Sequence, residues 1–188
     1  MADTLSSDQR HRNMAAIHSS NTKPEVKLRH ALWKWGFRYK VNDRSLPGSP
    51  DIVLPKYRSV IFVHGCFWHG HKVQVESRAS AMGDRNEELH DSACCRIPTT
   101  NREFWVRKIR RNMRRDVVIQ QRLAQMGWHC MTVWECELRP SVREQTLRSL
   151  AFTLNRIWLQ DHSLRRPYPQ RQEEELVQIA AEERFERL

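Results

Sequence analysis

Apolar side chains recur at helical spacing in three stretches of the chain. The first follows a capping-box sequence at residues 22–25 and ends at Gly36. The second covers residues 100–126, and the third follows another capping-box sequence at residues 141–144. These patterns predict three amphipathic helices with the following buried faces, in order: Leu28, Ala31, Leu32 and Trp35; Phe104, Trp105, Ile109, Met113, Val117 and Leu123; Leu147, Leu150, Leu154, Ile157 and Trp158.

Short apolar runs predict the strands. Residues 51–54 and 59–64 are joined by a short link, and the second run is almost wholly apolar, as in a central strand covered on both faces. Residues 37–41 and 128–134 predict two more strands, whereas the polar stretch 72–91 predicts a solvated loop. This order of elements predicts an α/β fold with helices flanking a central mixed sheet.

The length of 188 residues fits one folded domain with appendages. Residues 1–20 are polar and basic and are expected to form a flexible arm, and residues 21–160 are expected to be the folded domain, with 72–93 as an inserted loop. Residues 161–188 form an acidic tail for which we expect a helix. No apolar run is long enough for a membrane span or a secretory signal, so we expect a cytoplasmic protein.

The charge favours a polyanionic partner. The net charge is +10, and residues 171–188 hold three Arg and six Glu (−3), so residues 1–170 carry +13. A positive field of this size in a small domain is typical of nucleic-acid binding. Seven tryptophans fit the same expectation, because aromatic rings can stack on bases or enter between them.

Two strand ends carry candidate chemistry. Asp51 opens one predicted strand, and the next ends in the segment 64–71, which reads His-Gly-Cys-Phe-Trp-His-Gly-His. A carboxylate beside a polar strand end is where nucleases hold Mg²⁺, which prefers oxygen ligands. Taken alone, Asp51 could equally cap backbone amides in a turn. The segment 64–71 is more specific, because a protein core seldom holds so many imidazoles and large aromatics together.

At these residues the chain resembles the very-short-patch repair (Vsr) endonuclease family of bacteria. The resemblance covers roughly residues 8–160, and its matching stretches are 12–17, 22–25, 45–52, 60–69, 100–105, 108–116 and 127–136. It implies a restriction-endonuclease-like core. It also implies an enzyme that nicks double-stranded DNA 5′ to the thymine of a T·G mismatch, which arises by deamination of 5-methylcytosine. The expected enzyme acts as a monomer, and downstream repair proteins are its possible partners.

The resemblance also implies the catalytic roles around Mg²⁺. Val63 stands where an acid or another polar residue would be expected, so Asp51 is the expected sole direct carboxylate ligand. An ordinary imidazole has a pKa near ~6.5, so both protonation forms are expected near neutrality. The implied roles are a direct ligand (Asp51), a main-chain carbonyl ligand (Val63), a contact through metal-bound water (Glu25), a base with its orienting partner (His69, Asp116), and a group on the phosphate or leaving-group side (His64).

DNA recognition is implied to be by wedging side chains into the duplex. Phe67, Trp68 and Trp105 match residues that enter from the major groove, and Met14 matches one that enters from the minor groove. The alternative for Trp105 is a core position on its helix. Phosphate contacts are expected from the basic side chains Arg10, Arg12, Arg102, Arg107, Lys108, Arg110, Arg111, Arg114 and Arg115.

The five cysteines favour a metal site over a disulfide framework. The family has a structural Zn²⁺ site whose ligands match Cys66, His71 and Cys136. The third ligand in chain order is expected to be Cys94, with Cys95 or His90 as alternatives, and Cys130 is expected to be a buried thiol. Unliganded buried thiols are the competing interpretation.

Two other functions compete with mismatch nicking. One is a related nicking endonuclease with a different DNA target, since the insertion and the tail depart from the family. The other is a zinc-stabilised DNA-binding protein without catalysis. The intact set of Asp51, His64, His69 and Asp116 argues against the second.

Overall fold

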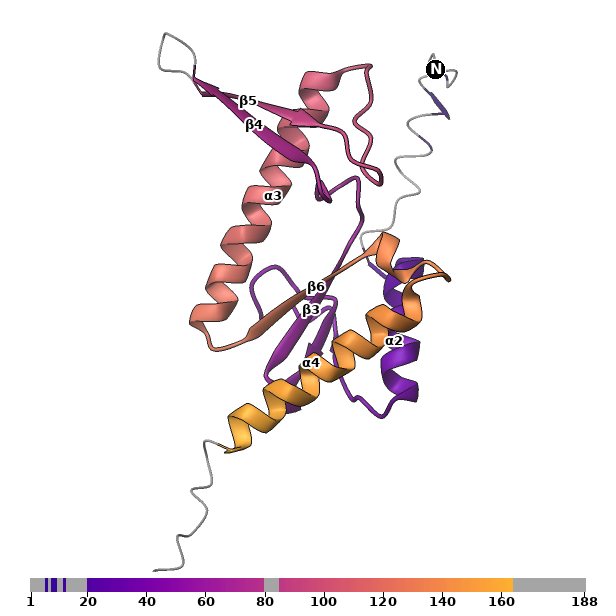
Figure 1. Cartoon of the computed structure of the whole chain (residues 1–188), viewed down its shortest axis with the longest axis vertical. Helices are drawn as coiled ribbons and strands as arrows, with labels where there is room; N and C mark the ends of the chain where they lie inside the picture. The colour runs from indigo at the N-terminus through magenta and orange to yellow at the C-terminus, as the bar shows by residue number, and fades with distance from the viewer. Residues whose placement is uncertain (1–5, 7, 10–11, 13–19, 80–84, 164–188) are drawn as a thin grey trace, which may run out of the picture.

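The computed structural model describes residues 6, 8–9, 12, 20–79 and 85–163 of the chain. Figure 1 shows a central sheet with helices around it and a separate ribbon of two strands. Along the chain the elements are α2 (Lys23–Lys34), β1 (Lys40–Val41), β2 (Ile52–Leu54), η1 (Pro55–Tyr57), β3 (Ser59–His64), β4 (Gln74–Ala79), β5 (Arg85–His90), α3 (Arg102–Gln125), β6 (His129–Trp134), η2 (Glu135–Leu138) and α4 (Arg143–Ser163).

The central sheet is mixed, as predicted. Its strand order is β1-β2-β3-β6, with antiparallel pairing from β1 to β3 and parallel pairing between β3 and β6. The parallel register pairs Ser59 with His129 and His64 with Trp134, so both strands end at the same edge. Residues that follow these two strand ends therefore start from neighbouring positions.

Both faces of the sheet are covered. Ile52, Leu54 and Ile61 pack with α2 and α4 in one core cluster. The alternate residues Val53 and Val60 pack with Leu123 of α3 in a second cluster on the other face. Figure 1 shows α3 on the opposite side of the sheet from α2. The α/β fold with flanking helices is thus confirmed. Among the described residues, none of the helices is long and apolar enough to cross a membrane.

Several local predictions were wrong. Most of the expected loop 72–91 is an antiparallel hairpin, in which β4 pairs with β5. Trp35, Phe104 and Val117 were expected inside but are 40%, 50% and 54% exposed. Trp35 ends its helix instead of continuing the apolar face, and the first strand is only two residues long. The helix α4 runs to residue 163, and the expected division into arm, domain and tail stays a prediction. The rest of the predicted tail lies outside the described residues.

Candidate active site and metal centre

The predicted catalytic residues line a single pocket of about 980 Å³. Asp51 directly precedes β2, and the antiparallel register that pairs Ile52 with Ile61 places it beside the end of β3. The helices α2 and α3 complete the pocket. Its lining includes all five expected side chains and the residue expected to offer its main chain: Glu25, Asp51, Val63, His64, His69 and Asp116.

The Asp51 carboxylate lies in a largely buried position that disfavours its charged form. Burial raises its pKa from 3.8 to about 6, and repulsion from Glu25 adds to the increase. The Val63 amide opposes this, because it donates a 2.7 Å hydrogen bond to Asp51 Oδ2. One carboxylate oxygen is thereby held in place, while Oδ1 has no hydrogen bond among the described residues. A buried carboxylate with a second carboxylate nearby fits a hard divalent cation.

Glu25 is held by a polar network that includes a buried arginine. The Glu25 carboxylate accepts hydrogen bonds from the Thr22 hydroxyl (2.7 Å) and the Asn21 amide (2.9 Å), and Arg29 Nη2 lies 2.9 Å from it. Arg29 also donates to the Asp51 main-chain carbonyl at 3.3 Å. The predicted capping box is therefore wrong, because the Thr22 side chain donates to Glu25 and caps no backbone amide.

Sequence analysis missed Arg29. The residue is 7% exposed, and its guanidinium links the carboxylate of Glu25 to the backbone of Asp51, so it holds these two candidate metal contacts together. The available signal was the spacing of four residues between Glu25 and Arg29, which places the two side chains on one face of a helix.

His69 and Asp116 form a tight pair across 47 residues of sequence. His69 Nδ1 lies 2.6 Å from Asp116 Oδ2, and both side chains are largely buried. Close packing of the loop 65–71 on α3 makes this contact feasible. Gly70 has a φ of +62°, and a Cβ there would meet Met113 Sδ at 2.8 Å and Ile109 Cγ2 at 3.0 Å, so glycine favours this close approach of the loop to the helix.

His64 stacks face to face on His69, with ring centroids 3.8 Å apart and planes 10° apart. Burial lowers the pKa of His64 to about 4, and the neighbouring His69 adds to the decrease. The expectation that both protonation forms are available near neutrality is therefore wrong for His64, which is neutral there. Although His64, His69 and Asp116 are close enough to share a metal, two stacked imidazoles point their nitrogen lone pairs along parallel planes, which disfavours a common ion.

The four expected zinc ligands converge around His71, which belongs to the same loop 65–71. His71 Nδ1 lies 3.6 Å from Cys66 Sγ, 3.2 Å from Cys94 Sγ and 3.3 Å from Cys136 Sγ. All four ligand atoms lie within 4.8 Å of one another. Tetrahedral zinc with bonds of about 2.0–2.3 Å needs ligand atoms about 3.5–3.8 Å apart, so this cluster can hold a metal ion with small adjustments.

The structure separates the three alternatives for the third cluster residue. Cys94 belongs to the cluster, whereas the Cys95 thiol faces the Phe67 carbonyl at 3.7 Å and His90 pairs with Glu76 at 3.1 Å. Burial raises the pKa of Cys66 to about 12, so without a metal this thiol is protonated at neutral pH. Burial also lowers the pKa of His71, which favours the neutral imidazole that metals bind. Cys130 lies outside the cluster, as expected, but is only partly buried.

The Trp134 ring lies between His71 of the cysteine cluster and the stacked pair of His64 and His69. Its ring stacks on His71 at 4.1 Å and meets the edge of His64 at 5.4 Å. The chain of contacts therefore runs from the cysteine cluster through Trp134 and His64 to His69. Sequence analysis identified Trp134 only as the end of a strand. Its role depends on the strand register that pairs it with His64.

The three aromatics expected to enter the DNA from the major groove lie together. Ring centroids are 5.1 Å apart for Phe67 and Trp68, and 5.2 Å apart for Phe67 and Trp105. Lys108 places its ammonium 5.1 Å from the Trp68 ring. Trp105 is half-buried and also packs on a small core beneath the hairpin, so it combines a core position with an accessible edge. The exposed ring of Phe104 extends this group, at 5.1 Å from Trp105.

The N-terminal predictions are only partly covered by the structure. Arg12 is exposed and donates a 3.4 Å hydrogen bond to the Asp8 carbonyl. Met14 and Arg10 lie outside the described residues.

Comparison with known proteins gives a consistent result. Residues 2–75 match the family model of the DNA mismatch endonuclease Vsr. The chain is 40% identical over 139 residues to the type II nicking enzyme V.NmeAIP of Neisseria meningitidis. This aligned region covers 74% of this chain and 86% of that relative. It is 39% identical over 139 residues to the DNA mismatch endonuclease Vsr of Escherichia coli, with 74% and 77% of the two chains covered. The type II nicking enzyme V.XorIIP of Xanthomonas oryzae is 37% identical over 138 residues. The chain therefore belongs to the Vsr family of DNA mismatch endonucleases.

Proposed function

We propose that this protein is a Mg²⁺-dependent endonuclease that nicks duplex DNA 5′ to the thymine of a T·G mismatch and so initiates very-short-patch repair. The observation that carries the proposal is the convergence of Glu25, Asp51, His64, His69 and Asp116 on one pocket. Family membership supports DNA nicking, and the names of the relatives include both mismatch and nicking enzymes.

The residues that would hold Mg²⁺ are Asp51 through its carboxylate, Val63 through its main-chain carbonyl and Glu25 through bound water. When bound, the ion supplies charge that stabilises the phosphate and lowers the pKa of an attacking water. Arg29 holds the Glu25 carboxylate in place beside Asp51. The cluster of Cys66, His71, Cys94 and Cys136 would hold a structural Zn²⁺.

His69 is the base in this proposal. If its Nδ1–H donates to Asp116, the ring is fixed in the tautomer whose Nε2 lone pair is free to take a proton from water. His64, held neutral by burial, serves as a hydrogen-bonding group on the phosphate side. Its stacked contact with His69 also limits rotation of the base.

Recognition of the mismatch is assigned to the aromatic group. Phe67, Trp68 and Trp105 would enter the duplex from the major groove and Met14 from the minor groove. Opening a base step costs a few kcal/mol and costs least at a mismatch, which supplies selectivity. Lys108, beside the aromatic group, and Arg12, on the N-terminal arm, would neutralise phosphates.

The test is a nicking assay on otherwise identical duplexes with a T·G mismatch or a T·A pair, with and without Mg²⁺. We expect a Mg²⁺-dependent nick 5′ to the mismatched thymine only. Asp51→Ala should bind the mismatched duplex and fail to cut it. Equal cutting of the matched duplex would instead favour a different DNA target. Binding without cutting by the unaltered protein would favour a non-catalytic DNA-binding role.

A further inference from the structure

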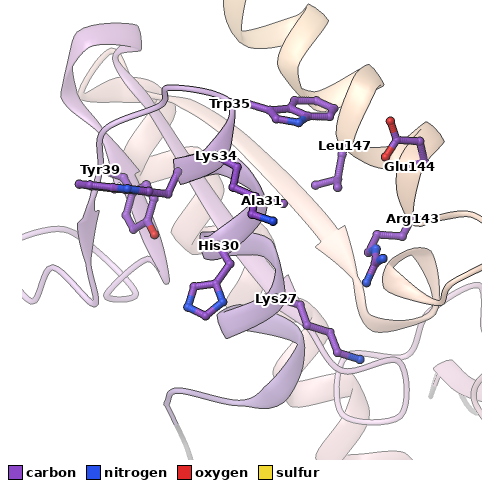
Figure 2. Close-up of a pocket in the computed structure, with 10 residues that line it drawn as sticks. Lys27, His30, Ala31, Lys34, Trp35, Tyr39, Arg143, Glu144 and Leu147 are labelled. Atoms are coloured by element: carbon purple, nitrogen blue, oxygen red, sulfur yellow. The ribbon is translucent and has the colours of Figure 1, made fainter.

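A second pocket lies on the surface between α2 and α4. It has a volume of about 770 Å³ and is separate from the candidate active site, with which it shares no lining residue. Figure 2 shows that side chains from both helices border it. Lys27 and Lys34 come from α2 and Arg143 from α4, while Trp35 and Leu147 supply apolar surface. We call it the α2–α4 pocket.

The α2–α4 pocket has unbalanced positive charge. The side chains of Lys27, Lys34 and Arg143 are exposed, and no acidic group among the described residues forms an ion pair with them. The one acidic lining residue, Glu144, is paired with Arg148 at 3.1 Å. Trp33 and Trp35 are 55% and 40% exposed beside these cations. An apolar floor with a cationic rim suits a segment that combines carboxylates with apolar side chains.

The chain itself contains such a segment. Residues 173–186 carry six Glu and one Arg, a net charge of −5, with apolar residues between the glutamates. We propose that this acidic segment binds in the α2–α4 pocket of its own chain. The glutamates are Glu173, Glu174, Glu175, Glu182, Glu183 and Glu186, and the apolar residues between them are Leu176, Val177, Ile179, Ala180, Ala181 and Phe185.

The lengths agree with binding within one chain. The helix α4 ends at Ser163, and its pocket residues Leu147 and Arg143 lie 16 and 20 residues earlier. At about 1.5 Å per helical residue, these positions are about 24–30 Å from the helix end. The nine residues 164–172 can span about 30 Å when extended. The connection is thus long enough to return the first glutamates to the pocket.

Binding there would neutralise part of a cationic surface outside the active-site pocket. A duplex that binds nonspecifically to this surface would be held away from the catalytic residues. The acidic segment therefore competes with DNA at the α2–α4 pocket and leaves the active-site pocket as the preferred DNA site. This inference does not depend on the mismatch specificity proposed above.

The test is zero-length carbodiimide crosslinking of the full-length protein, which joins a lysine amine to a carboxylate in direct contact, followed by peptide mass spectrometry. We expect amide bonds from Lys34 or Lys27 to glutamates 173–175. Lys56 is the matched control, because it lies against Trp158 near the end of α4 and so closer to the origin of the tail. A tail without a binding site would react with Lys56 more readily than with Lys34.

Two variants and a mixing experiment complete the test. Lys34→Glu should remove the Lys34 crosslink. Combining it with Glu174→Lys should restore an amide bond between the two positions, with the amine now at position 174 and the carboxylate at position 34. Lys34 is exposed, and circular dichroism checks that each variant folds. A mixture of ¹⁵N-labelled and unlabelled protein should give crosslinks only within one isotope. Crosslinks at Lys56 in place of Lys34, crosslinks between isotopes, or no crosslink in the unaltered protein would each overturn the proposal.

Discussion

The ionised carboxylate of Asp51 should lower the stability of the metal-free protein. Burial raises its pKa from 3.8 to about 6, which corresponds to a cost of about 3 kcal/mol for carrying the charge in the folded state at neutral pH. Asp51→Asn removes the charge and keeps an oxygen that can accept the hydrogen bond from the Val63 amide. We therefore expect this variant to be about 1–3 kcal/mol more stable than the unaltered protein at pH 7.5 without Mg²⁺.

The dependence on pH has a definite direction. The pKa of Asp51 is higher in the folded than in the unfolded state, so its stabilising contribution is complete below about pH 4. The contribution is lost as the pH rises towards about 6 and stays lost above that. The advantage of Asp51→Asn should therefore be absent at pH 4, grow between pH 4 and 6, and remain constant at higher pH.

Urea unfolding, followed by circular dichroism across this pH range, measures the difference. Added Mg²⁺ should raise the unfolding midpoint of the unaltered protein and leave that of Asp51→Asn unchanged, because binding to the folded state stabilises it. Asp43→Asn is a matched control, since hydrogen bonds from Ser45 lower the pKa of that exposed carboxyl and its removal should give no gain. If Asp51→Asn were no more stable than the unaltered protein at pH 7.5, the reasoning would be refuted.

Three further predictions concern residues around the site. Arg29→Met should destabilise the protein by about 3–5 kcal/mol in urea unfolding, because it leaves Glu25 buried without its partner; an unchanged midpoint would contradict this. Trp134→Ala should lower kcat for nicking with Zn²⁺ retained, whereas Trp134→Phe should restore most of it; equal rates for both variants would exclude a positioning role. Cys94→Ser should reduce the bound zinc measured by atomic absorption, and Cys95→Ser should not; the reverse result would reassign the ligand.

The main elements of the fold could be predicted from the sequence because each buries several apolar side chains. The helices α2 and α4 follow the periodicity of their leucines, and the apolar run of β3 indicates a central strand. The hairpin of β4 and β5 has no such signal. It forms a separate sheet of two strands. Of the hairpin side chains that the structure describes, those at 74–76 are exposed and Leu89 belongs to a core cluster. Strands without a buried face show no alternation of polar and apolar residues.

The exposed aromatics were mispredicted for a related reason. Helical spacing says which residues share a face but not which other element covers it. Phe104 belongs to the first turn of α3, beside the group of Phe67, Trp68 and Trp105, and no other described element buries it. Trp35 follows the last turn of α2 and leaves the apolar face of that helix. Such positions at helix ends depend on tertiary contacts, which a single sequence does not specify.

Some residues of the candidate site could be predicted from the sequence, and others could not. The residues of segment 64–71 could be identified because their types and spacing are unusual, and their partners from the resemblance to the family. Arg29 and Trp134 could not, since an arginine on a basic helix and a tryptophan at a strand end are common. Their roles become visible only when the contacts of Arg29 with Asp51 and of Trp134 with His64 and His71 are known.

The two candidate metal-binding regions share one structural cause. The parallel strands β3 and β6 end at the same edge, so the segments that follow His64 and Trp134 meet there. Only one residue separates His69 from His71, and His71 is surrounded by three thiols. A metal in the cysteine cluster would therefore fix the loop that carries the candidate base, in addition to the contact of His69 with Asp116. Held by both contacts, the His69 imidazole would need little reorganisation to accept a proton in its proposed role, which is the contribution that a structural metal can make to catalysis at a neighbouring site.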